Sequence, residues 1–367
     1  MFVKVVDAKK LVNMDNVCVI DVRSEDEFKN GTISGAINIP ILNNKEREEV
    51  GFTYVNKSVC DAKRLALRYA GYKLEDIFNK VSEVFENNKE IVFFCARGGM
   101  RSLTVHNLFN SIGIKNYKLD MGYKGYRKFL RENFENYLKN IRFIVIHGKT
   151  GIGKTKILKE LKTQGYPVID LERAANHRAS FLGGVNLGEQ NSQKNFESII
   201  FHDILEIIKT NKCDDSEKIH VFIEGESKRI GKIIIPEYFF KVMNEGIHVY
   251  VDLPIQIRVE NLIADYLKVS LSEIKNRKVN IDSEILKDFK ESMNLLDKYS
   301  NKNNMEEYRT LFKNAEYERL AEVLIMNYYD PKYLNSMGKH NFEFKFELNN
   351  LNEFLIELKG VYKLLKK

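Results

Sequence analysis

The sequence predicts an α/β protein of two successive domains, each built on a parallel sheet, with a helical portion late in the second. Its 367 residues suffice for two domains of roughly 100–200 residues each. Short apolar runs alternate with helical patterns twice along the chain, which favours parallel sheets covered by helices. A polar, helix-prone stretch at 131–142 separates the two series. We therefore predict domains at 1–132 and 133–367, with the helical portion at about 255–335.

The first series predicts a sheet with short helices between its strands. Gly31, Gly35 and Pro40 mark turns, and Gly113 can end the last helix because glycine adopts the conformation that follows a helix. The expected strands are 17–22, 36–39 and 91–94, and the expected helices are 25–29, 61–69, 74–85 and 102–112.

The second series predicts another sheet followed by helices. From residue 255 to about residue 326 the pattern is mostly helical and heavily charged. Residues 342–348 alternate apolar and charged side chains, which predicts a late edge strand. The earlier expected strands are 143–147, 167–170, 220–224 and 248–252, and the expected helices around the sheet are 154–164 and 351–365.

Composition and charge exclude several classes of protein. The chain is 44% hydrophobic and 30% charged, which is typical of a globular protein and not of a disordered chain or a collagen-like fibre. No stretch approaches the roughly 18 apolar residues of a membrane span, and the N-terminus lacks the apolar core of a signal peptide. The net charge of +7 permits an RNA partner without requiring one.

The four cysteines, Cys18, Cys60, Cys95 and Cys213, are scattered and form no CxxC pair. We therefore expect neither a structural metal site nor a disulfide framework. The expected compartment is a reducing one, the cytoplasm. Only Cys95 lies in a sequence context that favours chemistry.

Cys95 begins a loop between a predicted strand and a predicted helix. The loop has the sequence CARGGMR and ends at Arg101, six positions after the cysteine. Successive N–H groups at a helix N-terminus bind anions, and nearby guanidinium groups favour the thiolate. We predict that Cys95 is a nucleophile or carries a chalcogen, with Arg97 and Arg101 as further catalytic residues. A buried cysteine at a strand end is the alternative, but it would not need this pattern of arginine and glycine.

A second motif, GKTGIGKT, matches GxxxxGK[ST] without a mismatch. It follows a predicted strand and precedes a predicted helix, which is the context of a phosphate-binding loop. Its N–H groups should hold a di- or triphosphate, and its threonine could hold Mg²⁺. The motif leaves the ligand open, because a nucleotide and a prenyl diphosphate would both suit it. The predicted phosphate-binding residues are Gly148, Gly151, Gly153, Lys154 and Thr155.

Polar residues gather after the strands that follow this loop. The segment DLERAANHR begins at one strand end, and EGESKR begins at another. Ligand-contacting residues of parallel sheets lie at the carboxyl ends of strands, so these segments predict further site residues. Solvated polar loops are the alternative. The candidates are Asp170, Asn176, His177, Arg178, Glu224, Ser227 and Arg229.

The first 130 residues or so resemble the rhodanese domain. Asp21-Val22-Arg23, then Glu27-Phe28, then the stretch from Gly31 to Pro40 carry the resemblance. It makes Asp21 and Arg23 candidate site residues and implies that the cysteine of the late loop carries sulfur. The C-x5-R spacing also occurs in phosphatases on the same scaffold, although Phe94 stands where those phosphatases usually have histidine.

The whole chain resembles the tRNA 2-selenouridine synthase family. The resemblance rests on the order of four motifs: the CxRGGxRS loop, the phosphate loop, the DLExxANHR segment and a later ESxRIG. Ala96 departs from it, since the family typically has tryptophan there. The resemblance implies a rhodanese-like parallel-sheet domain followed by a P-loop NTPase-like α/β domain with a helical C-terminal portion.

The resemblance also implies a transferase that replaces the sulfur of wobble 2-thiouridine in tRNA with selenium from selenophosphate. The implied intermediate is S-geranyl-2-thiouridine, made from geranyl diphosphate. The phosphate loop would hold the diphosphate, Arg97 and Arg101 would hold selenophosphate, and Cys95 would carry selenium or assist displacement of geranylthiol. No prosthetic group and no membrane are implied, and a selenophosphate-producing enzyme is a candidate partner. Basic residues are also dense at 115–162, and we hypothesise that this stretch contacts tRNA; a solvated helical face is the alternative.

Two other functions fit the same motifs. A sulfurtransferase fused to an ATP-dependent kinase or ATPase would use the loop for a nucleotide. An RNA adaptor without catalysis would use it only for binding, but the intact cysteine and phosphate loop argue against that function.

Overall fold

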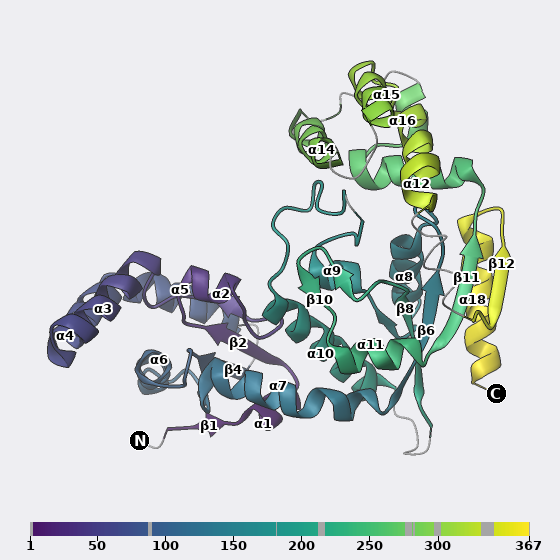
Figure 1. Ribbon diagram of the computed structural model, residues 1–367. Helices are drawn as coiled ribbons and strands as arrows, with labels where there is room; N and C mark the ends of the chain where they lie inside the picture. Colours follow the sequence, from purple (N-terminus) through teal and green to yellow (C-terminus); the bar gives the residue numbers. More distant parts are fainter. Residues whose placement is uncertain are drawn as a thin grey trace. The chain divides into compact units, whose positions relative to one another are not determined.

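Contacts divide the computed structural model into two compact units, each an α/β unit with a parallel sheet (Figure 1). The first unit is Met1–Asn136 with Ser192–Leu205, and the second is Tyr137–Asn191 with Glu206–Lys367. The predicted fold class is confirmed. The structure describes residues 3–86, 90–180, 182–211, 217–275, 281, 283–296, 302–331 and 341–366.

The first unit is built on a five-stranded sheet in the order β1-β5-β4-β2-β3, in which all neighbours are parallel. The central strand β4 has the sequence EIVFF, and its last four side chains are fully buried, as expected for a parallel strand covered on both faces. The elements are β1 (Val5–Val6), α1 (Ala8–Val12), β2 (Val17–Asp21), α2 (Glu25–Lys29), β3 (Ile37–Asn38), α3 (Asn44–Asn56), α4 (Val59–Gly71), α5 (Leu74–Glu86), β4 (Glu90–Phe94), α6 (Met100–Ser111), β5 (Asn116–Leu119) and α7 (Gly122–Leu138).

Helix α3 is an element that the sequence pattern did not predict. It begins with a capping box, in which Asn43 accepts from the N–H of Glu46 and Glu46 accepts from the N–H of Asn43. The helix buries only Thr53, so it lacks the apolar stripe by which amphipathic helices are recognised.

The second unit has a five-stranded parallel sheet in the order β12-β11-β6-β8-β7. The late strand β12 lies at the edge of this sheet, as predicted. A small antiparallel pair joins β9 to β10. The elements up to the last sheet-covering helix are β6 (Ile141–His147), α8 (Lys154–Thr163), β7 (Val168–Ile169), α9 (Leu171–Ala175), α10 (Gln193–Thr210), β8 (Ile219–Glu224), β9 (Arg229–Ile230), β10 (Ile233–Ile234), α11 (Glu237–Asn244), β11 (Ile247–Asp252), β12 (Phe344–Glu347) and α18 (Leu351–Leu365).

The helical portion of the second unit has its own apolar core. Buried side chains of α12, α14, α15 and α16 form this core, with Leu182 and Val185 from the loop before α10. Positions 276–280, 282, 297–301 and 332–335 of the predicted portion, and Cys213, lie outside the described residues. The helices are α12 (Ile255–Leu267), α13 (Leu271–Lys275), α14 (Ser283–Leu296), α15 (Lys302–Lys313), α16 (Tyr317–Leu324) and the π-helical turn η1 (Ile325–Tyr329).

The start of α10 belongs to the first unit although it follows the phosphate loop in the sequence. Asn195 accepts a hydrogen bond from the N–H of Thr32 at 2.8 Å, and Ser198 accepts one from the N–H of Ser34 at 2.9 Å. The two predicted domains were continuous stretches and did not include this insertion. The boundary at 132/133 stays a prediction.

Candidate functional site

Cys95 lies directly after β4 and before α6, as the sequence predicted. Cys95 is 3% exposed, and its Sγ lies 3.2 Å from the hydroxyl oxygen of Ser102 in the first turn of α6. The loop is attached to the start of α7, because the N–H of Tyr123 donates to the carbonyl of Cys95 at 2.9 Å. Gly122 makes this approach possible, since a Cβ there would lie 2.1 Å from the same carbonyl oxygen.

These surroundings lower the pKa of the Cys95 thiol. Burial alone would raise it, but the Ser102 hydroxyl, the N–H groups of Ser102 and Arg97 and the charge of Arg101 outweigh burial. The thiolate, the form that a nucleophile requires, therefore forms more easily than in a free cysteine.

Arg101 is held by a carboxylate that the sequence prediction did not single out. Its two terminal nitrogens donate to the two oxygens of Glu27 at 2.6 and 3.0 Å. Arg47 also contacts Glu27, with Nε at 3.2 Å from Oε2. The side chain of Arg97 is exposed. A substrate anion would thus meet Arg101 as part of an ion pair, whereas Arg97 projects toward solvent, and the predicted role of each stays a prediction.

Asp21 and Arg23 form a buried ion pair behind the loop. Arg23 Nη2 lies 2.6 Å from Asp21 Oδ2 and also donates to the carbonyl of Gly31 at 2.6 Å. The guanidinium lies 4.3 Å from the ring centre of Tyr123 and 5.5 Å from that of Phe94. The pair therefore ties the end of β2 to the loop before β3, which is a supporting position.

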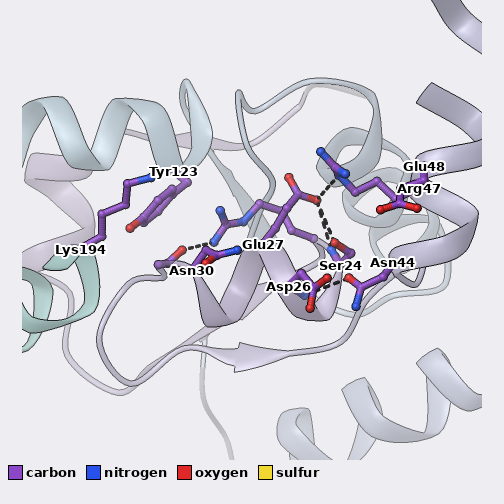
Figure 2. Close-up of a pocket in the computed structure, with 11 residues that line it drawn as sticks. Ser24, Asp26, Glu27, Asn30, Asn44, Arg47, Glu48, Tyr123 and Lys194 are labelled. Carbon is purple, nitrogen blue, oxygen red and sulfur yellow. Dashed lines mark hydrogen bonds and ion pairs between the residues drawn. The ribbon is translucent and has the colours of Figure 1, made fainter. Parts of the chain in front are cut away.

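A polar cavity of about 250 Å³ lies beside Glu27, between α2, α3, the start of α7 and Lys194 (Figure 2). The hydroxyl of Tyr123, a residue 8% exposed, has no hydrogen-bond partner within the described part of the chain. Both acidic and basic side chains line the cavity, so charge alone does not select an anion there.

The phosphate loop joins β6 to α8, in the predicted context. Gly151 and Gly153 have φ angles of +85° and +80°, which favour glycine. At Gly151 a Cβ would also lie 2.5 Å from the carbonyl oxygen of Arg258. The Lys154 Nζ donates to the carbonyl of Gly148 at 3.4 Å, so the lysine folds back over the loop.

Helix α12 is hydrogen-bonded to this loop, a contact that the sequence pattern did not indicate. Arg258 Nε donates to the carbonyl of Thr150 at 2.9 Å, and Asn261 Nδ2 donates to that of Gly151 at 2.8 Å. Arg258 is 3% exposed and is held in place by an ion pair with Asp330. One face of α12 therefore lines the phosphate site in a fixed position.

Carboxyl groups gather on the other side of the loop. Thr155 Oγ1 donates to Glu172 at 2.8 Å, and the N–H of Glu172 donates to Glu224 at 2.8 Å. Asp170 accepts from the N–H of Arg173 and so begins α9. Glu172 belongs to the DLERAANHR segment, but it was not among the predicted site residues.

Burial raises the pKa values of these carboxyl groups. That of Glu172 rises to about 8 through burial and the charge of Glu226, although Lys154 and Thr155 oppose the change. Burial and neighbouring carboxylates raise the pKa of Glu224 well above its usual value, and burial raises those of Asp170 and Glu226. At neutral pH the cluster thus carries less negative charge than four free carboxylates would.

The segment after α9 is held by two of the predicted residues. Asn176 adopts a left-handed conformation, with φ +50°, and its Nδ2 donates to the carbonyls of Leu187 and Glu189. Arg178 donates to the carbonyls of Val185 and Asp265, both at 2.7 Å. His177 packs against Gly183, where a Cβ would lie 2.6 Å from the ring. Asn176 therefore shapes the loop.

A cavity of about 60 Å³ brings part of the predicted site together. The phosphate loop forms one side of it, and Arg178 and Glu172 lie on another. Ser227 and Arg229 are not among its lining residues. Ser227 Oγ instead donates to the carbonyl of Arg229, at the start of β9. The other lining residues are Ser180, Leu262, Asp265 and Tyr266.

Among the described residues, no three His, Cys, Asp or Glu side chains are arranged to hold a metal ion. None of the helices described is long and apolar enough to cross a membrane.

Two family descriptions match the chain. Residues 141–357 match the AAA domain of tRNA 2-selenouridine synthase, and residues 4–129 match the rhodanese-like domain. The tRNA 2-selenouridine synthase of Nitrosomonas eutropha is 30% identical over 88% of this chain and 88% of its own length. That of Bdellovibrio bacteriovorus is 33% identical over 71% of this chain and 67% of its own.

Solved structures match about a third of the chain. The N-terminal domain of a putative ATP/GTP binding protein from Clostridium difficile is 40% identical over 35% of this chain and 98% of that chain, with a TM-score of 0.34. A rhodanese-like domain protein from Staphylococcus aureus is 20% identical over 34% of this chain and 90% of that chain, with a TM-score of 0.20.

Proposed function

The chain belongs to the tRNA 2-selenouridine synthase family and is a transferase that puts selenium into tRNA, and we propose that it does so in two steps. In the first, geranyl diphosphate alkylates the sulfur of wobble 2-thiouridine. In the second, selenium from selenophosphate replaces the alkylated sulfur. The observation that carries the proposal is that one chain holds both a thiol of lowered pKa and a phosphate loop.

The phosphate loop serves the first step. The sulfur on C2 of the base attacks C1 of geranyl diphosphate, and the base releases its N3 proton to solvent. The C–O bond breaks, and its electron pair leaves on diphosphate. The N–H groups of the loop and the charge of Lys154 stabilise this leaving group. Glu172, whose pKa is raised to about 8, is largely protonated at neutral pH and so repels the diphosphate little. Alkylation prepares the sulfur to leave as a thiol.

Cys95 serves the second step as a nucleophile. The selenium of selenophosphate is already fully reduced, so forming a sulfur–selenium bond on Cys95 would need an oxidant. Displacement needs none: the Cys95 thiolate attacks C2 of the alkylated base, the C–S bond to the geranylated sulfur breaks, and that sulfur takes a proton and leaves as geranylthiol. Selenium then attacks C2 and expels Cys95 as thiolate. Water finally cleaves the P–Se bond, which releases phosphate and leaves 2-selenouridine.

The other predicted ligands and partners are selenophosphate, Mg²⁺, the basic contacts with tRNA and a selenophosphate-producing enzyme. Selenophosphate follows from the reaction, and Arg97 is the exposed cation of the cysteine loop that could meet it. Mg²⁺ at Thr155 stays a prediction, and in this structure the Thr155 hydroxyl donates to Glu172. Contacts of residues 115–162 with tRNA, a selenophosphate-producing partner and a cytoplasmic location stay predictions.

Mass spectrometry of nucleosides tests the two steps separately. Pure protein is incubated with 2-thiouridine tRNA and with geranyl diphosphate, selenophosphate or both. We expect geranylated thiouridine with the first substrate alone and selenouridine only with both. An unchanged nucleoside under all three conditions would contradict the proposal, and ATP hydrolysis with thiosulfate:cyanide activity would then favour the sulfurtransferase alternative.

A further inference from the structure

We infer that the helical portion of the second unit holds the isoprenoid tail of a prenyl diphosphate whose phosphates lie on the loop from Gly148 to Thr155. The inference rests on the proposed function, because it locates the tail of the first-step substrate. It starts from an apolar cavity, here called the tail cavity, which lies among α12, α14, α16 and Leu182.

The tail cavity adjoins the phosphate cavity along α12. Leu262 and Tyr266, one helical turn apart, line both cavities. On the same helix, Asn261 binds the carbonyl of Gly151, while Ile263 and Leu267 line the tail cavity alone. A ligand with phosphates on the loop would therefore find apolar side chains next to it, on a helix that the loop itself holds.

The chemistry of the tail cavity suits a hydrocarbon chain. Of the ten described residues that line it, eight are Leu, Ile, Phe or Ala, and the other two are tyrosines. The hydroxyl of Tyr266 already lies 2.6 Å from Ser180 Oγ, which leaves it less able to pair with a ligand. A nucleobase placed there would lose its hydrogen bonds to water without replacement, which is costly. An isoprenoid tail loses none and gains from leaving water.

The unfilled volume of the tail cavity is about 20 Å³, less than a ten-carbon chain needs. The tail can therefore enter only if helices move. Phe289 on α14 stacks on Phe312 with ring centres 5.5 Å apart. Among the described side chains that line the cavity, Tyr317 at the start of α16 is the one that is partly exposed. We expect α14 and α16 to separate around the tail.

Calorimetry on the full-length protein tests the inference with inorganic diphosphate, geranyl diphosphate and ATP. If the tail is buried, geranyl diphosphate binds at least about tenfold more tightly than inorganic diphosphate, a gain that burial of roughly two methylene groups would supply. Equal affinities for the two would overturn the inference.

Two variants locate the effect. Ala321→Phe fills the tail cavity and should bring the ratio of the two affinities close to one, while the affinity for inorganic diphosphate stays within about twofold. Met326→Phe is the matched control, because Met326 is 56% exposed just after α16 and should leave the ratio unchanged. A folded Ala321→Phe protein that keeps the wild-type ratio would contradict the assignment.

Hydrogen exchange on the wild-type protein covers the case in which Ala321→Phe does not fold. Geranyl diphosphate should slow exchange in α12, α14 and α16 beyond the protection that inorganic diphosphate provides. Protection limited to the loop and α8 would refute a tail in the helical portion.

The tRNA assay separates this inference from the proposed function. Selenouridine formed by a protein that binds the two diphosphates equally would leave the function standing and overturn the tail cavity. A clear preference for geranyl diphosphate without any change in the nucleoside would support the cavity and contradict the function.

Discussion

The cysteine loop and the phosphate loop share a strand–loop–helix architecture but treat their charges in opposite ways. In the cysteine loop, Arg101 is paired with the ionised carboxylate of Glu27. At the phosphate loop, Lys154 faces Glu172 and Glu226, whose pKa values are raised. One loop therefore neutralises its cation internally, and the other places its cation beside carboxyl groups that keep their protons to a higher pH than free carboxyl groups do.

This difference follows from what each loop must stabilise. A nucleophile is itself the anion, so short hydrogen bonds from Ser102 and the N–H groups suffice for the Cys95 thiolate. A binding loop must attract an anion from water, and a fully neutralised lysine would do so poorly. The comparison predicts that substitutions at the cysteine loop slow selenation, whereas substitutions at the phosphate loop slow geranylation.

The largest effect is expected from Cys95→Ser. A serine hydroxyl stays protonated at neutral pH, so selenouridine formation should fall by at least about 10³-fold. Geranylation should continue, because it depends on the other loop, and geranylated tRNA should accumulate in the nucleoside assay. Cys60→Ser, at an exposed cysteine of α4, is the control and should behave as wild type. Full selenation by Cys95→Ser would refute the role of the cysteine.

Lys154→Ala should reverse this pattern. Loss of the charge on the leaving diphosphate should slow geranylation by about 10²–10³-fold. Selenation of tRNA that is already geranylated should proceed. The matched control is Lys149→Ala in the same loop, because Lys149 lies 2.7 Å from Asp252 in an ion pair of its own. If both variants slowed geranylation equally, the special role of Lys154 would be wrong.

Ser102→Ala should raise the pKa of Cys95, since the hydroxyl is the foremost group that lowers it. Selenation at neutral pH should fall by about tenfold, near the lower end of what one hydrogen bond to a charged group contributes. Site-resolved alkylation of Cys95 against pH measures the shift. Ser111→Ala is the control, because Ser111 lies at the other end of α6 and donates to the carbonyl of Leu108. An unchanged alkylation profile would contradict the hydrogen-bond explanation.

Glu172→Gln should have the smallest effect, on the pH dependence of stability. Glu172 keeps its proton up to about pH 8 when folded but loses it near pH 4.5 when unfolded. The folded protein therefore binds more protons between these values, and the free energy of unfolding falls as the pH rises. Glutamine cannot titrate, so the fall should be smaller in the variant. Urea unfolding from about pH 5 to about pH 8 checks this, with the exposed Glu347→Gln as control.

Much of the scaffold could be predicted because it depends on local pattern. The compact apolar runs of β4 and β6 and the glycines of the phosphate loop are sufficient to place both loops after parallel strands. Helix α3 was missed because it buries a single side chain and so shows no apolar period.

The partners of the site residues could not be predicted. Arg101 meets Glu27 across 74 positions, and Arg178 meets the carbonyl of Asp265 across 87. The insertion of residues 192–205 into the first unit likewise depends on hydrogen bonds to Thr32 and Ser34, which no local pattern indicates.

The two reactive loops follow from local sequence, since a cysteine, a lysine and their glycines act through backbone geometry that neighbouring residues impose. Which charges remain beside these loops, and where an apolar tail could lie, depends on contacts between residues far apart in the chain. The free energy of a charge depends on every group that surrounds it in space, and an apolar cavity exists only where helices distant in sequence pack imperfectly.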